Sequence, residues 1–271
     1  MSAKTLYITD LDGTLLQSDQ TISPYTAAVI NALVGRGMLF SYATARSIVT
    51  ASKITAAITP SIPVIVYNGT FIVENGTGRR LLDHYFPPED ARRVLAVLAK
   101  GGVHPFVYAA IDGAERYSFV PERMTEGMRR FHATRLDSRQ RPASPETVGE
   151  GEIFHFSCID TSEKLVPLYE VLRKEFPCVC YREMYSGDQW LEIMPRGVTK
   201  ATAVCQLKQM LGCERIVCFG DGKNDISMFE ISDECYAVAN ADEELKAIAT
   251  GVIGDNDHDG VARWLEENAV Y

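Results

Sequence analysis

The sequence lacks the residue spacings that mark disulfide, zinc or histidine-based chemistry. Its 271 residues contain seven cysteines, an odd number, and no two of them are spaced as Cys-x-x-Cys. The five histidines are scattered, and none forms a His-Glu-x-x-His motif. We therefore expect buried thiols, and the pattern gives little support to a disulfide framework, a zinc site or a histidine-based nucleophile.

Basic residues are in deficit. The chain has 27 Lys and Arg against 36 Asp and Glu, which gives a formal net charge of −9. Nucleic acids and anionic membranes require a basic face, so this balance disfavours both as partners. A small phosphorylated metabolite needs only a local positive patch, and it remains compatible with the composition.

Long apolar runs are also absent. No segment approaches the length of a membrane span, and Met1 to Lys4 leads directly into a strand-like run instead of a secretion signal. We expect a cytoplasmic protein without a membrane partner, either a monomer or a homodimer.

The chain has no internal repeat and no low-complexity tract, and its 46% hydrophobic residues suffice for packed cores. Strand and helix patterns alternate at both ends of the chain with short loops. The first part reads as a strand at 6–8, a helix at 23–37, a strand at 38–44, a helix at 47–58 and a strand at 63–69. The alternation resumes from Thr199. This rhythm predicts an α/β fold with a doubly wound, Rossmann-like parallel sheet.

The middle of the chain departs from this rhythm. Residues 83–188 contain strand and helix patterns of their own, with weak periodicity at 121–150. The block is long enough to be a second α/β domain inserted into the first. We therefore predict one domain from residues 1–82 and 189–271, and an inserted domain from residues 83–188.

Two aspartates follow the first strand, in the stretch "LYITDLDGTLL". Asp10 and Asp12 would lie near the carboxyl end of a parallel strand, where open α/β sheets bind their ligands. The alternative is a solvated Asx-Gly turn at Asp12 and Gly13. No G-x-G-x-x-G follows this strand, and acidic residues there would repel a pyrophosphate, so a dinucleotide-binding dehydrogenase is excluded.

A second acidic cluster lies in "VCFGDGKND", residues 217–225. Asp221 follows a hydrophobic strand, and Asn224 and Asp225 begin the next helix; alone, this would be a turn and a helix cap. Two acidic clusters at strand ends of one sheet are harder to explain as turns and caps. If the strands are neighbours, the carboxylates at 10, 12, 221 and 225 converge, and oxygen ligands of this kind suit Mg²⁺.

Two candidates for phosphate binding lie between the acidic clusters. Thr44 ends the second strand, where its hydroxyl and nearby backbone N–H groups could hold an anion. Lys200 opens a helix, an unfavourable place for a cation unless a phosphate or an aspartate cluster compensates the helix dipole. Considered one at a time, Thr44 could simply be a helix cap and Lys200 a solvated side chain.

These motifs, in this order, resemble the haloacid dehalogenase superfamily of phosphotransferases. They are "DLDGT" at 10–14, Thr44 in "ATAR", Lys200 in "GVTK" and "GDGKND" at 220–225. Three further stretches are similar to the Cof-like subgroup, which has a large α/β cap: "YNGTFI" at 67–72, "LEIMPRGVTKATAV" at 191–204 and "DHDGVARWL" at 257–265. One departure is Ala45, where the subgroup usually has glycine.

The resemblance implies roles for individual residues. Asp10 would be the nucleophile that forms an aspartyl-phosphate, and Asp12 the general acid and then base. Mg²⁺ would bridge the phosphoryl group to Asp10, the backbone carbonyl of Asp12 and Asp221. Asp225 would ligate the metal through water or orient Lys200. The residues implied to hold phosphate or substrate are Thr44, Arg46, Lys200 and Asn224.

The implied function is a Mg²⁺-dependent phosphatase acting on a small phosphate monoester, most plausibly a sugar phosphate. A phosphomutase of the same superfamily is an alternative that the motifs do not separate. A regulator that binds Mg²⁺ and an anion without turnover is another, and the intact Asp12 argues against it. Four residues at the end of the inserted block or just after it could meet a leaving group or could be packing: Tyr181, Arg182, Tyr185 and Trp190.

Overall fold

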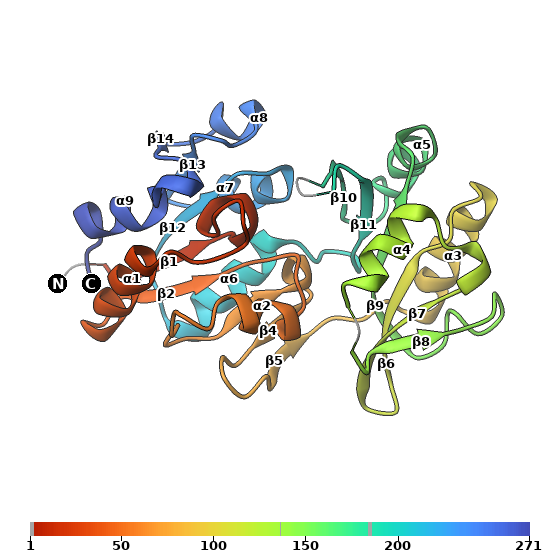
Figure 1. Cartoon of the computed structure of the whole chain (residues 1–271). Coiled ribbons are helices and arrows are strands. Elements are labelled where there is room, and N and C mark those ends of the chain that lie inside the picture. Colours follow the sequence, from red (N-terminus) through yellow and green to blue (C-terminus); the bar gives the residue numbers. More distant parts are fainter. Residues whose placement is uncertain (1–2, 136, 184–185) are drawn as a thin grey trace. The chain divides into compact units, whose positions relative to one another are not determined.

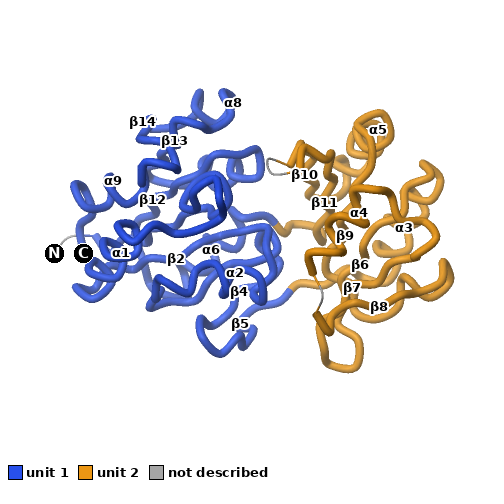
Figure 2. Tube along the Cα trace, in the orientation of Figure 1, with its two compact units in different colours: residues 1–83, 199–271 blue, residues 84–198 orange. Residues whose placement is uncertain are grey.

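The computed structural model describes residues 3–135, 137–183 and 186–271 of the chain. Its contacts divide the chain into two compact units (Figure 2). Unit 1 comprises residues 1–83 and 199–271, and unit 2 comprises residues 84–198. The sequence predicted that the chain returns from the inserted domain to the first domain near residue 188. In the structure this return comes after Val198, because the strand at Gln189–Ile193 pairs with strands of unit 2.

Unit 1 is built on a five-stranded parallel sheet in the order β14-β13-β12-β1-β2 (Figure 1). The strand β1 pairs with the central strand β12 on one side and with the edge strand β2 on the other, with Leu6 opposite both Ile216 and Leu39. The first and last thirds of the chain thus share one sheet, as predicted. The strands are β1 Thr5–Thr9, β2 Leu39–Tyr42, β12 Arg215–Gly220, β13 Glu234–Val238 and β14 Gly251–Ile253.

The helices of unit 1 begin where the sequence predicts them. The helix α1 has Pro24 at its first position and is capped by Ser23, whose Oγ accepts a bond from the Thr26 N–H. α1 packs against α9, and α6 packs against α7, β3 and β4. The helices are α1 Pro24–Gly35, α2 Ile48–Ile54, α6 Lys200–Leu211, α7 Ile226–Glu230, α8 Glu243–Lys246 and α9 Gly260–Asn268. Short helical turns occur at Leu11–Leu15, Tyr67–Gly69, Lys223–Asp225 and Asn256–His258.

The strand predicted at 63–69 joins the parallel sheet through a single bridge between Ala43 and Ile65. It forms instead β3, Val64–Val66, of an antiparallel sheet with β4, Phe71–Val73, and β5, Arg80–Asp83. The cause is the turn at Tyr67–Gly69. All three of its residues have positive φ, so the chain reverses there and pairs with itself.

Unit 2 is a six-stranded sheet in the order β10-β11-β9-β6-β7-β8. One of its faces, with Val107, Phe156 and Leu191, contributes to the buried core together with side chains of α3 and α5. The strands are β6 Phe106–Ile111, β7 Ala114–Phe119, β8 Gln140–Pro142, β9 Glu152–Asp160, β10 Cys178–Arg182 and β11 Gln189–Ile193. The helices are α3 Pro88–Lys100, α4 Glu126–Ala133 and α5 Ser162–Leu172, with a short turn at Pro121–Arg123.

The residues of unit 2 singled out in the sequence have different environments. Trp190 is buried and packs edge-on against Phe131, with ring centroids 4.9 Å apart, which favours the packing interpretation. Tyr181 stacks on Trp190 at 6.4 Å. Arg182 is exposed and donates to the Gly187 carbonyl. Tyr185 lies outside the described residues.

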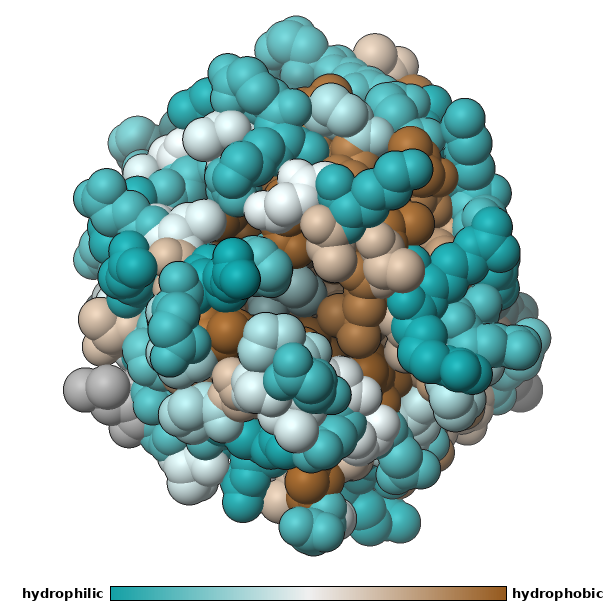
Figure 3. All heavy atoms as spheres, turned by 90° about the vertical axis from the view of Figure 1, so that its right-hand side faces the viewer, coloured by the Kyte–Doolittle hydropathy of each residue, from teal (hydrophilic) through white to brown (hydrophobic). Residues whose placement is uncertain are grey.

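The surface is largely polar. Figure 3 shows one face on which hydrophobic side chains gather in a hollow between hydrophilic ones. In the described part of unit 2, the large hydrophobic side chains that are exposed are Val166 and Val171 on α5. Among the described residues, no helix combines the length and the apolar character that crossing a membrane would require.

Candidate active site

The first acidic turn begins where β1 ends. Asp10 is buried, and its backbone N–H donates to the carbonyl of Phe219 on β12 at 2.9 Å. The chain then winds through one helical turn, Leu11–Leu15, which is interrupted at Gly13 with φ +73°. A Cβ at Gly13 would lie 2.4 Å from Asp221 Oδ2. Glycine is therefore required here both by the backbone conformation and by the close approach of Asp221.

The second acidic turn follows β12. Asp225 Oδ2 accepts bonds from the backbone N–H groups of Asp221, at 3.0 Å, and Gly222, at 3.1 Å. A Cβ at Gly220 would lie 2.7 Å from the Asp225 carboxylate, so glycine is required at the end of this strand. Asp225 thus fixes the turn that presents Asp221.

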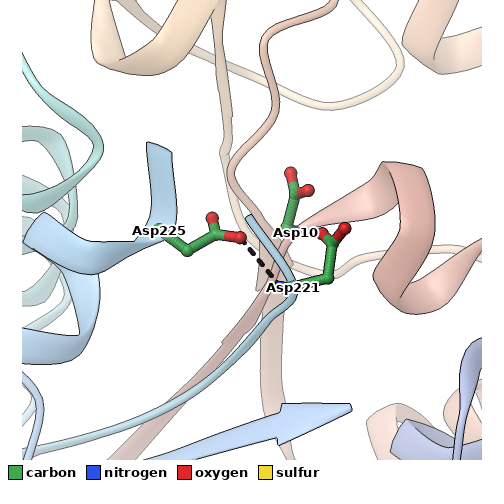
Figure 4. A group of neighbouring side chains, drawn as sticks. All are labelled: Asp10, Asp221 and Asp225. Carbon is green, nitrogen blue, oxygen red and sulfur yellow. Dashed lines mark hydrogen bonds between the residues drawn. The ribbon is translucent and has the colours of Figure 1, made fainter. Parts of the chain in front are cut away.

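The two turns bring three carboxylates together. One oxygen each of Asp10, Asp221 and Asp225 lies within 4.8 Å of the others (Figure 4). Thr14 of the first turn donates from Oγ1 to Asp221 Oδ1 at 2.9 Å, which links the two turns directly. Because β1 and β12 are neighbours in the sheet, these carboxylates converge as the sequence predicted.

Lys200 is the cation in this cluster. Its side chain is fully buried, and Nζ donates to Asp10 Oδ1 at 2.6 Å and to Asp225 Oδ1 at 2.8 Å. Lys200 is the first residue of α6, whose N-terminus is capped by reciprocal bonds between Thr199 and Thr202. Two carboxylates thus offset the unfavourable position of a cation at a helix start.

Burial controls the protonation of the cluster. It raises the pKa of the Asp10 carboxyl to about 7, against the opposing effect of the Lys200 ammonium. It also raises the pKa of Asp221 well above its ordinary value, and the charges of Asp10 and Asp225 add to this effect. Burial alone would lower the pKa of Lys200, but the two carboxylates outweigh it and raise that pKa. The neighbouring carboxylates therefore favour the charged form of Lys200.

The donor set fits a divalent cation that prefers oxygen ligands. Three carboxylates share one ammonium, so the cluster carries an excess of negative charge in a buried place. A cation bound between Asp10 and Asp221 would favour their ionised forms and so oppose the effect of burial on their pKa values. The carboxylate of Asp12, which the sequence predicted to converge with the other three, is not in this group, because its side chain pairs with Arg46 instead. The resemblance implied a metal contact from the Asp12 backbone carbonyl, not from its carboxylate.

The Asp12 side chain forms an ion pair with Arg46. Arg46 Nε donates to Asp12 Oδ2 at 2.7 Å and Nη2 donates to Asp12 Oδ1 at 2.5 Å. Arg46 Nη2 also donates to Gln20 Oε1 at 2.8 Å. The sequence predicted Arg46 as a contact for substrate, whereas in this structure it engages both oxygens of Asp12.

Thr44 is fully buried at the end of β2. Its backbone N–H donates to the Ile65 carbonyl, and its Oγ1 accepts the Arg46 N–H at 3.1 Å. A threonine hydroxyl can donate one bond while it accepts others, so the donor role toward an anion stays open. Ala45 fits between Thr44 and Arg46 in this turn without a positive φ.

Asn224 lies beside a residue that sequence reasoning did not single out. Asn224 Nδ2 donates to Asn68 Oδ1 at 3.3 Å, and Asn68 is buried with φ +52°. A Cβ at the following Gly69 would lie 2.2 Å from the Thr199 carbonyl. The Asn-Gly pair was the available signal for this turn, because both residues tolerate positive φ.

The family comparison agrees with this geometry. The family model described as haloacid dehalogenase-like hydrolase matches residues 7–265. The match spans both acidic turns, Thr44 and Lys200, and it confirms the resemblance drawn from the motifs.

Individual relatives are similar over nearly their whole length. The HMP-PP phosphatase of Serratia proteamaculans is 29% identical over 266 residues, covering 95% of this chain and 92% of the relative. The pyridoxal phosphate phosphatase YbhA of Escherichia coli is 26% identical over 271 residues, covering 96% and 97%. The X-ray crystal structure of TM0651 from Thermotoga maritima superposes with a TM-score of 0.77 at 26% identity, covering 100% and 99%.

We predict that Lys200→Met destabilises the metal-free protein strongly. Methionine is apolar and flexible enough to occupy the space, but it leaves the buried carboxylates of Asp10 and Asp225, beside the half-buried Asp221, without a cation. Removing one partner of a buried ion pair costs about 3–5 kcal/mol. Urea denaturation in EDTA should show this loss, and added Mg²⁺ should recover part of it.

The matched control is Lys246→Met. Lys246 pairs with the exposed Glu243 at 2.9 Å, and loss of such a surface pair should change the free energy of unfolding by less than about 1 kcal/mol. Equal losses for the two variants would show that the carboxylate cluster does not depend on Lys200.

Proposed function

Because the chain belongs to the haloacid dehalogenase-like hydrolases and is a phosphatase of that superfamily, we propose that it hydrolyses a small phosphate monoester through an aspartyl-phosphate on Asp10. The observation that carries the proposal is the buried Asp10 carboxylate, held at 2.6 Å by Lys200 beside Asp221. An ionised, oriented carboxylate is a nucleophile for phosphorus once its repulsion toward the phosphate is neutralised.

The proposed reaction has two displacements. An Asp10 oxygen attacks phosphorus, the bond to the leaving oxygen breaks, and Asp12 gives that oxygen a proton. A water molecule then transfers a proton to Asp12 and attacks the phosphorus of the acyl phosphate. This step releases inorganic phosphate and restores the Asp10 carboxylate.

Asp12 can play these roles only if its ion pair opens. Both of its oxygens accept bonds from Arg46, which fix the orientation of the carboxyl group, so turning an oxygen toward the leaving group would break at least one of these bonds. We infer that the pair opens when substrate binds. Arg46 then becomes available to an oxygen of the substrate, which reconciles its predicted role as a substrate contact with its position here.

Mg²⁺ is the cofactor that we propose for the cluster, held by Asp10, Asp221 and the backbone carbonyl of Asp12. When bound, it would shield the approach of the anionic phosphate and stabilise charge on the transferring oxygens. Asp225 accepts protein bonds on both oxygens, so we assign it to orienting Lys200 and the Asp221 turn. Thr44, Lys200 and Asn224 would hold the remaining phosphate oxygens.

Unit 2 is proposed to select the substrate, which we take to be a cytoplasmic sugar phosphate or a similar small metabolite. Relatives named for HMP-PP and pyridoxal phosphate support a small phosphorylated compound. All the residues assigned to phosphate chemistry lie in unit 1. A separate unit that recognises the leaving group would leave the phosphate chemistry unchanged while specificity varies.

We predict that Asp10→Asn abolishes phosphate release and leaves the fold intact. The amide has the shape of the carboxylate but is a poor nucleophile, so the rate should fall by about 10³-fold or more. Phosphate release from p-nitrophenyl phosphate and a thermal melt measure the two effects. Asp19→Asn, an exposed substitution in a nearby loop, is the control, and near wild-type turnover in Asp10→Asn would contradict the covalent mechanism.

We predict that activity requires Mg²⁺ and that Asp221→Asn weakens its binding. The substitution keeps the acceptor bond from Thr14 possible but removes a charged ligand. Titration calorimetry with MgCl₂ should detect binding to the wild type and a large loss of affinity in Asp221→Asn. Full turnover after exhaustive chelation, or equal Mg²⁺ affinity in the two proteins, would refute the metal assignment.

We predict that replacing residues 84–198 by a Gly-Ser linker keeps turnover of p-nitrophenyl phosphate and removes preference among sugar phosphates. Circular dichroism must first show a folded product, because the deletion exposes new surface. A panel of phosphate monoesters then compares the deletion with the full chain. An unchanged substrate ranking would place specificity in unit 1.

A further inference from the structure

Two asparagines from the last third of the chain hold the turn that carries Asp12. Asn240 lies just after β13, and its Nδ2 donates to the Gly13 carbonyl at 2.7 Å. Asn256 lies in the stretch before α9, and its Nδ2 donates to the Leu16 carbonyl at 2.9 Å. The two are themselves joined, because Asn240 Oδ1 accepts the Asn256 backbone N–H at 3.1 Å. We call this pair the asparagine clamp.

The clamp holds the turn at the glycine with left-handed backbone and again at the end of the turn. The Gly13 carbonyl belongs to the residue with the left-handed backbone. The Leu16 carbonyl lies at the end of the turn, which the bond from the Leu16 N–H to the Leu11 carbonyl closes. A peptide plane next to a glycine is the easiest part of a turn to rotate. A strong acceptor bond at the Gly13 carbonyl opposes that rotation.

Rotation at Gly13 would move the residues on either side of it. Thr14 would leave Asp221 Oδ1, to which it donates at 2.9 Å. Asp12, the preceding residue, would change its position relative to Asp10. Neither asparagine has a recorded contact with the side chains of Asp10 or Asp221 among the described residues, so the clamp acts through the backbone.

We propose that Asn240 and Asn256 are positioning residues that keep the Asp12 carboxyl in register with Asp10 for proton transfer to the leaving oxygen. This inference rests on the proposed function. The effect should be mainly kinetic. One hydrogen bond of the exposed Asn240 contributes little to global stability, whereas a displacement of about 1 Å at a catalytic group can lower a rate by 10²-fold.

The test uses Asn240→Ala and Asn240→Ser in the full chain with two esters, p-nitrophenyl phosphate and phenyl phosphate. The phenol leaves poorly and needs the acid, whereas nitrophenol leaves without help. We expect kcat for phenyl phosphate to fall by about 10- to 100-fold, a much smaller fall for p-nitrophenyl phosphate, and a nearly constant KM. Amide hydrogen exchange should become faster in the peptide spanning residues 11–17.

The matched control is Asn31→Ala. Asn31 makes the same two kinds of bond as Asn240, since its Nδ2 donates to the Ala57 carbonyl and its Oδ1 accepts the Thr59 N–H, both at 2.9 Å. It lies on α1 in the same unit. Its loss should alter neither the ratio of the two esters nor exchange at 11–17.

The remaining outcomes decide against the proposal. Equal losses for the two esters, a change in KM with constant kcat, or unchanged exchange at 11–17 would each overturn it. Should Asn240→Ala fail to fold, Asn240→Ser is judged by the same criteria. If the wild type hydrolyses neither ester, the proposed function fails, and the exchange measurement alone decides whether the clamp holds the turn.

Discussion

The site in unit 1 depends on the clustering of three carboxylates beside one ammonium, with Asp10 and Asp225 buried and Asp221 half-buried. Asp10, Asp221 and Asp225 repel one another, and among the described residues Lys200 is the cation that offsets their charge. Such a cluster is stable only when every position is fixed from outside. The backbone N–H groups bonded to Asp225, the Thr14 hydroxyl on Asp221 and the glycine at position 13 are those constraints. The same excess of negative charge is what suits the cluster to a divalent cation.

Parallel pairing of β1 and β12 brings two acidic turns that are distant in sequence into one site. Thr9 lies opposite Phe219, so the two acidic turns leave the sheet at the same level. The elements that support them also come from far along the chain, since Asn240 and Asn256 hold the first turn from beyond β13. The site therefore forms only when the first and last thirds of the chain have folded together, whatever the length of the insertion between them.

Much of this could be predicted from residue patterns, and the failures have physical causes. Strand ends and helix caps such as Ser23 with Pro24 are local signals, and they located the sheet and the acidic turns. The reversal at Tyr67–Gly69 depends on backbone angles that a strand-like run conceals. The β6–β7 hairpin was missed although Asp112 and Gly113, both with positive φ, form a typical hairpin turn. The ion pair between Arg46 and Asp12 joins residues that are distant in sequence, and no rule based on sequence spacing predicts it.

The contacts that anchor Lys200 come from unit 1, beside the point where the chain returns from unit 2. The chain re-enters unit 1 at Thr199, one residue before Lys200. Reciprocal bonds with Thr202 fix Thr199, and Gly69 lies close against the Thr199 carbonyl. The carboxylates of Asp10 and Asp225 hold the Lys200 ammonium. All of these contacts lie within unit 1. The Lys200 ammonium is therefore held and balanced by groups of unit 1, immediately after the residue at which the chain leaves unit 2.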